Sequence, residues 1–547
     1  MAEKLCFALR GVFGATFYKN LKNPEVVFDH PLNPTDDVRV MGFSNQGEYF
    51  AFCDSLKTYL VDAENGKTVL EHDLPKPTIL IFSPKDTYFV TWEPYVIYGL
   101  RRNKEGEVRS PKPNLNFFSL KEKKHVTTCI ARKKEEVPYW TQDEKYMIRL
   151  SGSEVFVNEG NNIDSGKFKT VIHNVQSIEL SPSTTEYTIA AFVPSTKGDP
   201  AKVELRRILE DLPITKSLTL MSCDKVNMNW NARGSHLLVL ATQEVDTSGK
   251  SYYGRSFLHL VPVHGENIRI NFDKEGSIHD FKWNPLGQQF AVVYGFMPAK
   301  VAVYNVMGTV VWNLGEGSRN EIFYNPQGNI MLTCGFGSLS GGKIQIWNAE
   351  SREEVNTIEV PNTTHLGFSP DGQYFYTAIT APRMRVDNSY RLWHFTGKQV
   401  YEHVPQKYEL WEVQFRNIPS SIVPTKFAIP VLSKDEKAST GIPVKLSDGK
   451  EVAAGAIKKA GAYIPPNLRK AGSNEGALKP AGSTTIVKSE VEKKILKVKK
   501  LLHEINILKE KQGKGEKLEK NQLDKLSKEE EYKKQLKELI ESSTSES

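Results

Sequence analysis

The segments that most resemble catalytic motifs are all incomplete. The run TSGKS at 247–251 matches the end of a phosphate-binding loop, but GxxxxGK[ST] requires a glycine where this chain has Glu244. The glycine-rich run GFGSLSGG at 335–342 carries Leu339 where GxSxG requires the nucleophilic serine. The 12 histidines are scattered and form no HExxH zinc motif. We therefore predict a protein that is not an enzyme and uses no cofactor or metal.

The cysteines and the apolar runs indicate the compartment. The five cysteines are odd in number and widely spaced, which argues against a disulfide framework and against a CxxC zinc site. No stretch approaches ~18 uncharged apolar residues, so no membrane span is expected. Only Leu5 to Leu9 precede Arg10, and this run is too short for a signal peptide. A reduced compartment, the cytosol or the nucleus, follows; of the two we predict the cytoplasm, and we expect no membrane partner.

Charged and aromatic residues divide the chain of 547 residues into two parts. Lysine and arginine number 72 against 65 acidic residues, a formal net charge of +7. Positions 431–547 hold 25 basic and 18 acidic residues, so they carry the whole net charge and the preceding part is neutral. All eight tryptophans precede residue 412. We expect an aromatic-rich globular body that carries a basic tail with few aromatic residues.

A short pattern recurs along the body: an aromatic or apolar residue, Ser or Asn, a turn, and then an alternating strand. Clear copies begin at 43, 82, 283, 324 and 368, and weaker copies begin at 140, 180 and 230. In the copy Ser369-Pro370-Asp371-Gly372, proline presets the φ angle of the turn and glycine closes it. The flanking residues alternate between apolar and polar, which is the period of a strand. Each copy therefore predicts a β-hairpin.

The spacing of these hairpins predicts a closed ring of four-stranded blades. The eight copies from 43 to 368 have a mean spacing of about 46 residues, close to the ~40–45 residues of a propeller blade. A degraded ninth copy lies at Phe415, with too little body after it to finish a blade. We expect the N-terminal strands to complete that blade and close the ring. The predicted fold is an all-β, WD-repeat-like propeller of nine blades spanning 1–430, and an array of two-sheet sandwiches is the alternative.

Three segments with loop composition are candidates for binding. The first, 242–260, has charged and tyrosine side chains around two glycines. These side chains are Asp246, Lys250, Tyr252, Tyr253 and Arg255. The second segment is the glycine-rich run at 335–342, and the third, 380–397, contains Arg383 and Arg385. Arginine and tyrosine on loops suit RNA phosphates and exposed bases, or a protein surface. The alternatives are that the tyrosine pair packs between blades and that the arginines are solvated or paired.

The composition of residues 431–484 shifts to Lys, Ala, Gly, Ser and Pro, which predicts a flexible linker. The linker contains one compact motif, AYIPPNLRK at 462–470. Two prolines favour an extended chain, a tyrosine offers a stacking face, and two basic residues add charge. These residues are Pro465, Pro466, Tyr463, Arg469 and Lys470. We interpret the motif as a docking peptide, with an ordinary spacer as the alternative.

The segment 485–541 has the pattern of an α-helical hairpin. An apolar stripe runs from Val491 to Ile505 in steps of three and four residues, and Ser489 can cap this first helix. Its other faces carry five lysines: Lys493, Lys494, Lys497, Lys499 and Lys500. A mobile cationic helix pair on a neutral body suits a large polyanion, with contacts to phosphates rather than to bases. A merely solvated charge run is the alternative.

Six segments spread over nearly the whole chain carry a resemblance to a known family. They are VDTSGKSYYG (245–254), GFGSLSGGKIQIWN (335–348), TAPRMRVDNSYRLWHFTG (380–397), LWEVQFRNIP (410–419), AYIPPNLRK (462–470) and KLEKNQLDKL (517–526). With these segments the chain resembles the eukaryotic translation initiation factor 2A family. The resemblance implies a nine-bladed propeller that binds the small ribosomal subunit. It also implies placement of initiator methionyl-tRNA without GTP hydrolysis, at non-standard start codons and under stress.

Together these observations favour a non-enzymatic factor that binds RNA and the ribosome. The expected partners are the small ribosomal subunit and initiator tRNA, with mRNA and other initiation factors as further candidates and no DNA. The five helix lysines are the first candidates for the contact, followed by Arg469 and Lys470 and then by Arg383 and Arg385. The alternative is a propeller scaffold that assembles a protein complex in translation, in which the apolar stripe matters more than the lysines.

Overall fold

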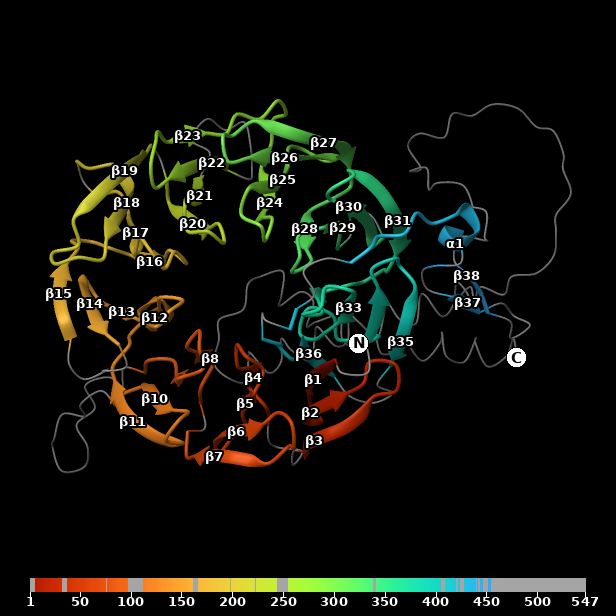
Figure 1. The fold of residues 1–547 in the computed structure, drawn as a ribbon, viewed down its shortest axis with the longest axis horizontal. Coiled ribbons are helices and arrows are strands. Elements are labelled where there is room, and N and C mark those ends of the chain that lie inside the picture. Colours follow the sequence, from red (N-terminus) through yellow and green to blue (C-terminus); the bar gives the residue numbers. More distant parts are fainter. Residues whose placement is uncertain are drawn as a thin grey trace, which may run out of the picture. The chain divides into compact units, whose positions relative to one another are not determined.

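Nine four-stranded antiparallel sheets follow one another around a ring (Figure 1). The computed structural model describes residues 5–453, with gaps at 32–36, 75, 97–111, 161–165, 197, 222, 244–253, 338–340, 405–408, 420–421, 424–426, 439, 441–442 and 446–450. The predicted nine-bladed propeller is confirmed. The predicted helical hairpin at 485–541 lies outside the described residues, as does the linker beyond residue 453.

Eight blades consist of four consecutive strands that run from the inner rim to the outer rim. Blade 1 has β4 (Val40–Phe43), β5 (Tyr49–Cys53), β6 (Thr58–Asp62) and β7 (Thr68–His72). Blade 2 has β8 (Ile79–Phe82), β9 (Tyr88–Trp92), β10 (Leu115–Ser119) and β11 (Lys124–Cys129). Blade 3 has β12 (Tyr139–Trp140), β13 (Tyr146–Ser151), β14 (Glu154–Glu159) and β15 (Gly166–Val171), and the 3-10 helix η2 (Lys134–Glu136) precedes it. Blade 4 has β16 (Ser177–Leu180), β17 (Thr188–Val193), β18 (Ala201–Arg207) and β19 (Ile214–Leu220).

The second half of the ring repeats this order. Blade 5 has β20 (Lys225–Trp230), β21 (His236–Gln243), β22 (Arg255–Pro262) and β23 (Ile268–Arg269). Blade 6 has β24 (Ile278–Trp283), β25 (Gln289–Tyr294), β26 (Ala299–Asn305) and β27 (Val310–Gly317). Blade 7 has β28 (Glu321–Tyr324), β29 (Ile330–Gly335), β30 (Lys343–Asn348) and β31 (Glu353–Glu359). Blade 8 has β32 (His365–Phe368), β33 (Tyr374–Ile379), β34 (Ser389–His394) and β35 (Gln399–His403).

Blade 9 joins the two ends of the ring, as the sequence predicted. Its strands are β36 (Leu410–Phe415), β1 (Cys6–Gly11), β2 (Gly14–Lys19) and β3 (Glu25–Pro31). Strands β36 and β1 pair antiparallel, with Phe7 opposite Phe415 and Leu9 opposite Val413. The Phe7 ring is 0% exposed and lies 5.2 Å from Tyr18 and 5.6 Å from the Tyr390 ring of blade 8. The closed ring leaves no gap in the circle of blades.

The segment after β36 contains short elements within the region predicted as linker. Helix α1 (Lys434–Ala438) begins after Ser433, whose hydroxyl accepts a hydrogen bond from the Glu436 amide at 3.2 Å. The Glu436 carboxylate accepts in return from the Ser433 amide at 2.8 Å, which completes a capping box. A two-stranded sheet of β37 (Pro443–Lys445) and β38 (Glu451–Ala453) follows.

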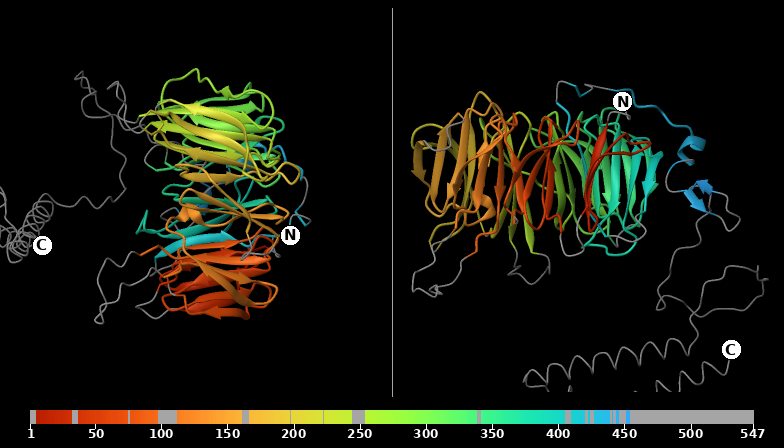
Figure 2. Two further views of the ribbon diagram at one scale, coloured as in Figure 1. Left: turned by 90° about the vertical axis from the view of Figure 1, so that its left-hand side faces the viewer. Right: turned by 90° about the horizontal axis from the view of Figure 1, so that it is seen from below.

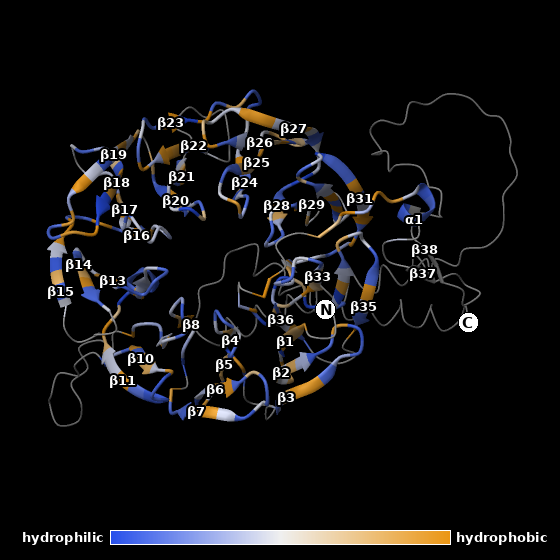
Figure 3. Ribbon diagram, viewed as in Figure 1, coloured by the Kyte–Doolittle hydropathy of each residue, from blue (hydrophilic) through white to orange (hydrophobic). Residues whose placement is uncertain are grey.

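The apolar core is divided among the blade interfaces. Among the described residues, nine clusters of buried apolar side chains each draw on two neighbouring blades. In one of them, Leu258 and Leu260 of blade 5 pack with Phe290 and Tyr304 of blade 6. Figure 3 shows the corresponding apolar stretches within the strands. Each blade therefore depends mainly on its two neighbours, as in other repeat proteins.

The two faces of the ring carry different connections. The turn face carries the turns between first and second strands and between third and fourth strands. The loop face carries the connections between second and third strands and those from one blade to the next; Figure 2 shows the ring edge-on. On the turn face, Asn284 Nδ2 donates to the Gly328 carbonyl of the next blade at 2.8 Å. Gly328 has φ +72°, and a Cβ there would collide with Asn284. The glycine of the repeat therefore permits a left-handed turn and a close approach between blades.

One half-buried carboxyl on an inner strand is expected to make stability depend on pH. Burial raises the pKa of Glu179 in β16 to about 7, whereas an unfolded chain titrates near ~4.3. The folded state binds the proton of Glu179 more tightly than the unfolded chain does. The contribution of this proton to folding stability is therefore complete below about pH 4 and is lost as pH rises through 7. We expect Glu179→Gln, which mimics the protonated form, to raise stability at pH 8 by about 1–3 kcal/mol and to change little at pH 4. Thermal melts of the variant and the unaltered chain at pH 4 and pH 8 test this. A stability difference between the two proteins that is the same at both pH values would contradict it.

Candidate interaction face

The three candidate loop segments are brought to one face of the ring. Each contains the connection between the second and third strands of its blade: β21 to β22, β29 to β30, and β33 to β34. These segments belong to three different blades, and the propeller order places them on the loop face. Of the first segment's candidate residues, Arg255 is described and is exposed at the start of β22. The other four, Asp246, Lys250, Tyr252 and Tyr253, lie outside the described residues.

The loop between β33 and β34 is held against the strand that closes the ring. The Ala381 amide donates to the Leu410 carbonyl at 2.8 Å. The buried Asn388 side chain accepts from the Leu410 amide at 3.0 Å and donates to the Met384 carbonyl at 2.7 Å. These bonds fix the two ends of the loop, and its middle, including Arg385 and Val386, is exposed. The loop therefore presents its cationic residues on a rigid base.

The two arginines of this loop differ in their surroundings. Arg383 donates from Nη1 to the Thr364 carbonyl at 3.5 Å. Burial raises the pKa of Glu321 on β28, and the positive charge of Arg383 partly offsets that rise. Among the described residues, Arg385 makes no ion pair within 4.0 Å. Arg383 therefore balances part of the charge of Glu321, while Arg385 is the freer of the two for an anionic partner.

A second surface with arginines surrounds Arg255, between blades 5 and 6, and Asp273 and Glu275 also line it. It borders a cavity of about 640 Å³ lined partly by Arg255, Arg269, Phe257 and Phe272. The Arg269 guanidinium lies 4.5 Å from the centre of the Phe257 ring, within the range of a cation–π contact. Phe296, at the edge of the cavity, is 54% exposed. Exposed rings beside guanidinium groups suit unstacked bases and phosphates, and equally suit a protein surface.

Exposed apolar side chains are concentrated on the same face. Eight of the large ones lie in loop-face connections: Val12, Leu56, Val96, Met221, Phe296, Met297, Val386 and Val404. The connections of the turn face carry five: Leu209, Leu286, Met307, Ile422 and Val431. Those of the loop face are spread over the loops of several blades, and neighbours such as Phe296 and Met297 offer apolar contact to a partner. Sequence reasoning missed these residues and Arg269, because a single apolar or basic residue in a loop has no periodic signal.

Metal-holding clusters and the state of the cysteines bear on possible chemistry in the described residues. These residues contain no group of three or more His, Cys, Asp or Glu side chains arranged to hold a metal ion. The cysteines are free thiols, and burial raises the pKa of Cys53 to about 12, so that thiol stays protonated at neutral pH. No described helix has the length and apolar character to cross a membrane.

The ring and its loop face define the class: a closed nine-bladed β-propeller with a candidate binding face. Residues 218–413 match the family described as eukaryotic translation initiation factor eIF2A. A protein named eukaryotic translation initiation factor 2A from Caenorhabditis elegans is 37% identical to this chain, over 98% of this chain and 100% of its own length. The relative of the same name from Schizosaccharomyces pombe is 33% identical, over 78% of this chain and 72% of its own length.

One solved structure agrees with these relatives. A crystal structure described as that of a eukaryotic initiation factor superposes with a TM-score of 0.67 and 29% identity, covering 76% of this chain and 100% of that one. The chain belongs to the eukaryotic translation initiation factor 2A family. Because its relatives are named as initiation factors, this membership supports a role in translation initiation and partners within the translation machinery.

Proposed function

We propose that this protein binds the small ribosomal subunit and helps to place initiator methionyl-tRNA there without hydrolysing GTP. It acts in the cytoplasm, at non-standard or stress-regulated starts. The observation that carries the proposal is the 37% identity to an initiation factor 2A over nearly the whole chain. The loop face makes contacts to ribosomal RNA or protein, and the lysines of the tail add electrostatic attachment to phosphates. The proposal assigns no catalytic residue.

The contribution of the loop face is tested by Arg383→Gln/Arg385→Gln in the full chain. Glutamine is chosen because glutamate would add repulsion beside Glu321. We expect affinity for purified small subunits to fall about 10-fold, and the slope of log affinity against log salt to flatten by about 2, because two phosphate contacts are lost. Co-sedimentation over a salt series, with and without initiator tRNA, measures both quantities.

The matched control removes two charges from the turn face of neighbouring blades. Arg352 and Lys398 are both exposed in turns between third and fourth strands. Arg352→Gln/Lys398→Gln changes the net charge by the same amount and is expected to leave binding within about 2-fold, since exposed substitutions away from a contact have small effects. An equal loss of affinity in the two double variants would show that binding does not depend specifically on the loop face.

A second candidate function is a scaffold that assembles a protein complex in translation. The observation in its favour is the set of eight exposed apolar side chains on the loop face. Apolar contacts lack the steep salt dependence of phosphate contacts. Binding that is lost in Phe296→Ala and Val386→Ala, but is insensitive to salt, would favour the scaffold over direct RNA contact.

A further inference from the structure

The neutral net charge of the body conceals one strongly cationic stretch. Residues 112–134 contain seven lysine and arginine residues and a single acidic residue, Glu122. The seven cations are Lys112, Lys121, Lys123, Lys124, Arg132, Lys133 and Lys134. All seven side chains are exposed. A surface that concentrates charge of one sign attracts a partner with many charges of the opposite sign.

This stretch forms the outer half of blade 2. The strand order of the blade is β11-β10-β9-β8, so β11 is the strand at the outer rim (Figure 1). The cations lie in two groups at the two ends of β11. The turn group is Lys121, Lys123 and Lys124, and the loop-face group is Lys112, Arg132, Lys133 and Lys134. The six residues of β11, at ~3.4 Å per residue, separate the two groups by about 20 Å.

The turn group lies on a well-defined hairpin turn. Ser119 and Lys124 are opposite one another in the ladder of β10 and β11, and the Glu122 amide donates to the Ser119 hydroxyl at 3.2 Å. Lys124 forms an ion pair with Glu122 at 2.8 Å. Within the described part of the chain, Lys121 and Lys123 form no ion pair within 4.0 Å. These two lysines are therefore available to an external anion.

A cavity of about 340 Å³ opens beside the turn group, between blades 1 and 2. The polar side chains that line it include two lysines and two imidazoles: Lys123, Lys124, His72 and His125. The carboxylate in the described lining belongs to Glu71, which forms an ion pair with Lys57. Cations and hydrogen-bonding groups thus outnumber the acid, and a lysine-rich hollow of this kind suits a phosphate group.

The loop-face group is held by buried polar contacts. Glu136, which is 4% exposed, accepts from the Arg132 amide at 2.7 Å and from the Gly152 amide of blade 3 at 3.3 Å. The Asn114 side chain donates to the Ala131 carbonyl at 2.7 Å and accepts from the Ala131 amide at 2.8 Å. The backbone under these cations is therefore fixed before a partner arrives, which lowers the entropy lost on binding.

The other side chains of the stretch distinguish between kinds of partner. Its two Phe, Tyr or Trp residues, Phe117 and Phe118, are both 0% exposed, so no such ring is offered to an unpaired base. Val126, at 38%, is the one large apolar side chain exposed in residues 112–134, whereas a protein interface has an apolar centre. Base-paired RNA presents phosphates and ribose hydroxyls and keeps its bases stacked inside. It fits both observations.

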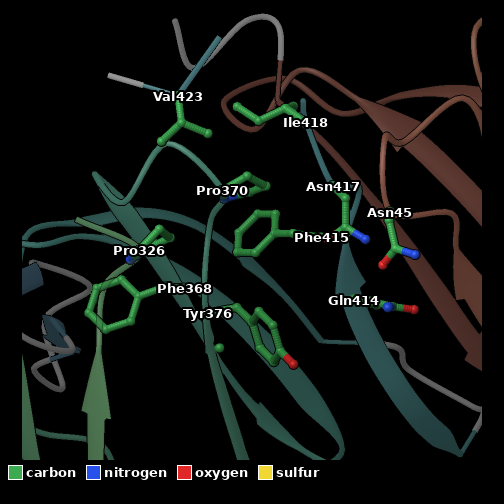
Figure 4. A pocket seen from close by; sticks show the side chains of 11 residues that line it. Asn45, Pro326, Phe368, Pro370, Tyr376, Gln414, Phe415, Asn417, Ile418 and Val423 are labelled. Atoms are coloured by element: carbon green, nitrogen blue, oxygen red, sulfur yellow. The ribbon is translucent and has the colours of Figure 1, made fainter. Parts of the chain in front are cut away.

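A pocket of about 480 Å³ on the turn face has the opposite character. Its described lining comes from blades 1, 7, 8 and 9 and contains apolar and amide side chains but no Lys, Arg, Asp or Glu. Figure 4 shows the Phe415 ring in this pocket directed toward Pro370. A phosphate would find no counter-charge there. The outer edge of blade 2 is therefore the better candidate for a polyanion.

We propose that the outer edge of blade 2, from Lys112 to Lys134, binds the sugar-phosphate backbone of base-paired RNA. The turn group and the loop-face group contact separate phosphates of one molecule, which a single free phosphate cannot do. The choice of RNA rests on the proposed function in translation. The surface itself is tested with a short duplex and without ribosomes, so the two proposals can fail separately.

The test measures the affinity of the full chain for a fluorescein-labelled RNA duplex of about 20 base pairs by anisotropy across a salt series. The turn variant is Lys121→Gln/Lys123→Gln/Lys124→Gln, and the loop-face variant is Arg132→Gln/Lys133→Gln/Lys134→Gln. Each is expected to weaken binding about 30-fold at ~0.1 M salt, because three phosphate contacts are lost. The slope of log affinity against log salt is expected to flatten by about 2–3 in each variant.

The matched control removes three exposed lysines from turns of blades 9, 1 and 8: Lys22→Gln/Lys67→Gln/Lys398→Gln. It changes the net charge by the same amount and is expected to leave affinity for the duplex within about 2-fold.

Two further variants separate charge from folding. Lys121→Arg/Lys123→Arg/Lys124→Arg keeps the charge of the turn group and is expected to keep affinity for the duplex within about 2-fold. Glu122→Gln removes the acid that pairs with Lys124 and is expected to raise affinity about 3-fold. A gain of affinity cannot come from loss of folded protein.

Three results would overturn the proposal. The first is a loss of affinity in the turn and loop-face variants that is no larger than in the control. The second is an equally large loss for a uridine oligonucleotide with the same number of phosphates, which would assign the edge to single-stranded RNA. The third is binding of polyglutamate as tightly as the duplex, with loss in the same variants, which would assign the edge to an acidic protein segment.

Discussion

Replacing the five lysines of the first tail helix by glutamate is expected to weaken binding to purified small ribosomal subunits by 100-fold or more at ~0.1 M salt. The residues are Lys493, Lys494, Lys497, Lys499 and Lys500. The physical reason is counterion release, since each lysine that neutralises a phosphate frees condensed cations. If all five contact phosphate, the slope of log affinity against log salt is expected to flatten by about 4–5. Co-sedimentation of the full chain across a salt series measures affinity and slope together.

The control for this prediction alters the apolar stripe of the same helix and keeps its charge. Val491→Ser, Val498→Ser and Leu502→Ser, combined, remove apolar surface without changing any lysine. The phosphate hypothesis predicts that this variant keeps the salt slope of the unaltered chain. Loss of binding here, together with unchanged binding in the lysine variant, would favour the protein scaffold. An unchanged slope in the lysine variant would show that the tail does not contact phosphate.

The second large effect is expected at the closure of the ring. Phe7→Ala removes a fully buried ring that packs against Tyr18 of the same blade and Tyr390 of blade 8. We expect this variant to lower the free energy of unfolding by about 3–5 kcal/mol, the range for phenylalanine truncation in a core. Because Phe7 lies on the strand that pairs with β36, the loss also loosens the contact between the two ends of the ring. Urea unfolding followed by tryptophan fluorescence measures the shift in midpoint.

Phe296→Ala is the matched control for ring closure, since it removes the same side chain from an exposed loop. Its effect on unfolding is expected to stay within about 0.5 kcal/mol, as for most surface substitutions. Similar midpoints for Phe7→Ala and Phe296→Ala would mean that the β1–β36 seam contributes little to the stability of the ring.

The fold was predictable because its repeating signal is local. Ser369-Pro370-Asp371-Gly372 specifies a turn through the φ preference of proline and the left-handed freedom of Gly372, which has φ +70°. Alternation of apolar and polar residues predicts the flanking strands, and eight such hairpins at one spacing predict a ring. Closure by β1 followed from the short ninth repeat at Phe415. None of these inferences required knowledge of contacts between distant residues.

The candidate site was predictable only in part. The composition of 380–397 indicated a binding loop, and the structure shows Arg385 exposed on a base fixed by Asn388. Arg269 and Phe257 come together across β22 and β23, a pairing that neither residue's local sequence indicates. The tail lysines lie outside the described residues, so their assignment stays a prediction.

The sequence by itself determined the number of blades, the turn chemistry and the division into a neutral body and a basic tail, because these depend on residue type and on spacing along the chain. Only the tertiary structure decided that segments 242–260, 335–342 and 380–397 share one face. It alone showed the pocket on the turn face in which Phe368, Gln414 and Asn45 meet from three blades. Contacts between residues of different blades depend on the angle at which neighbouring blades pack. That angle is set by all nine blade interfaces together.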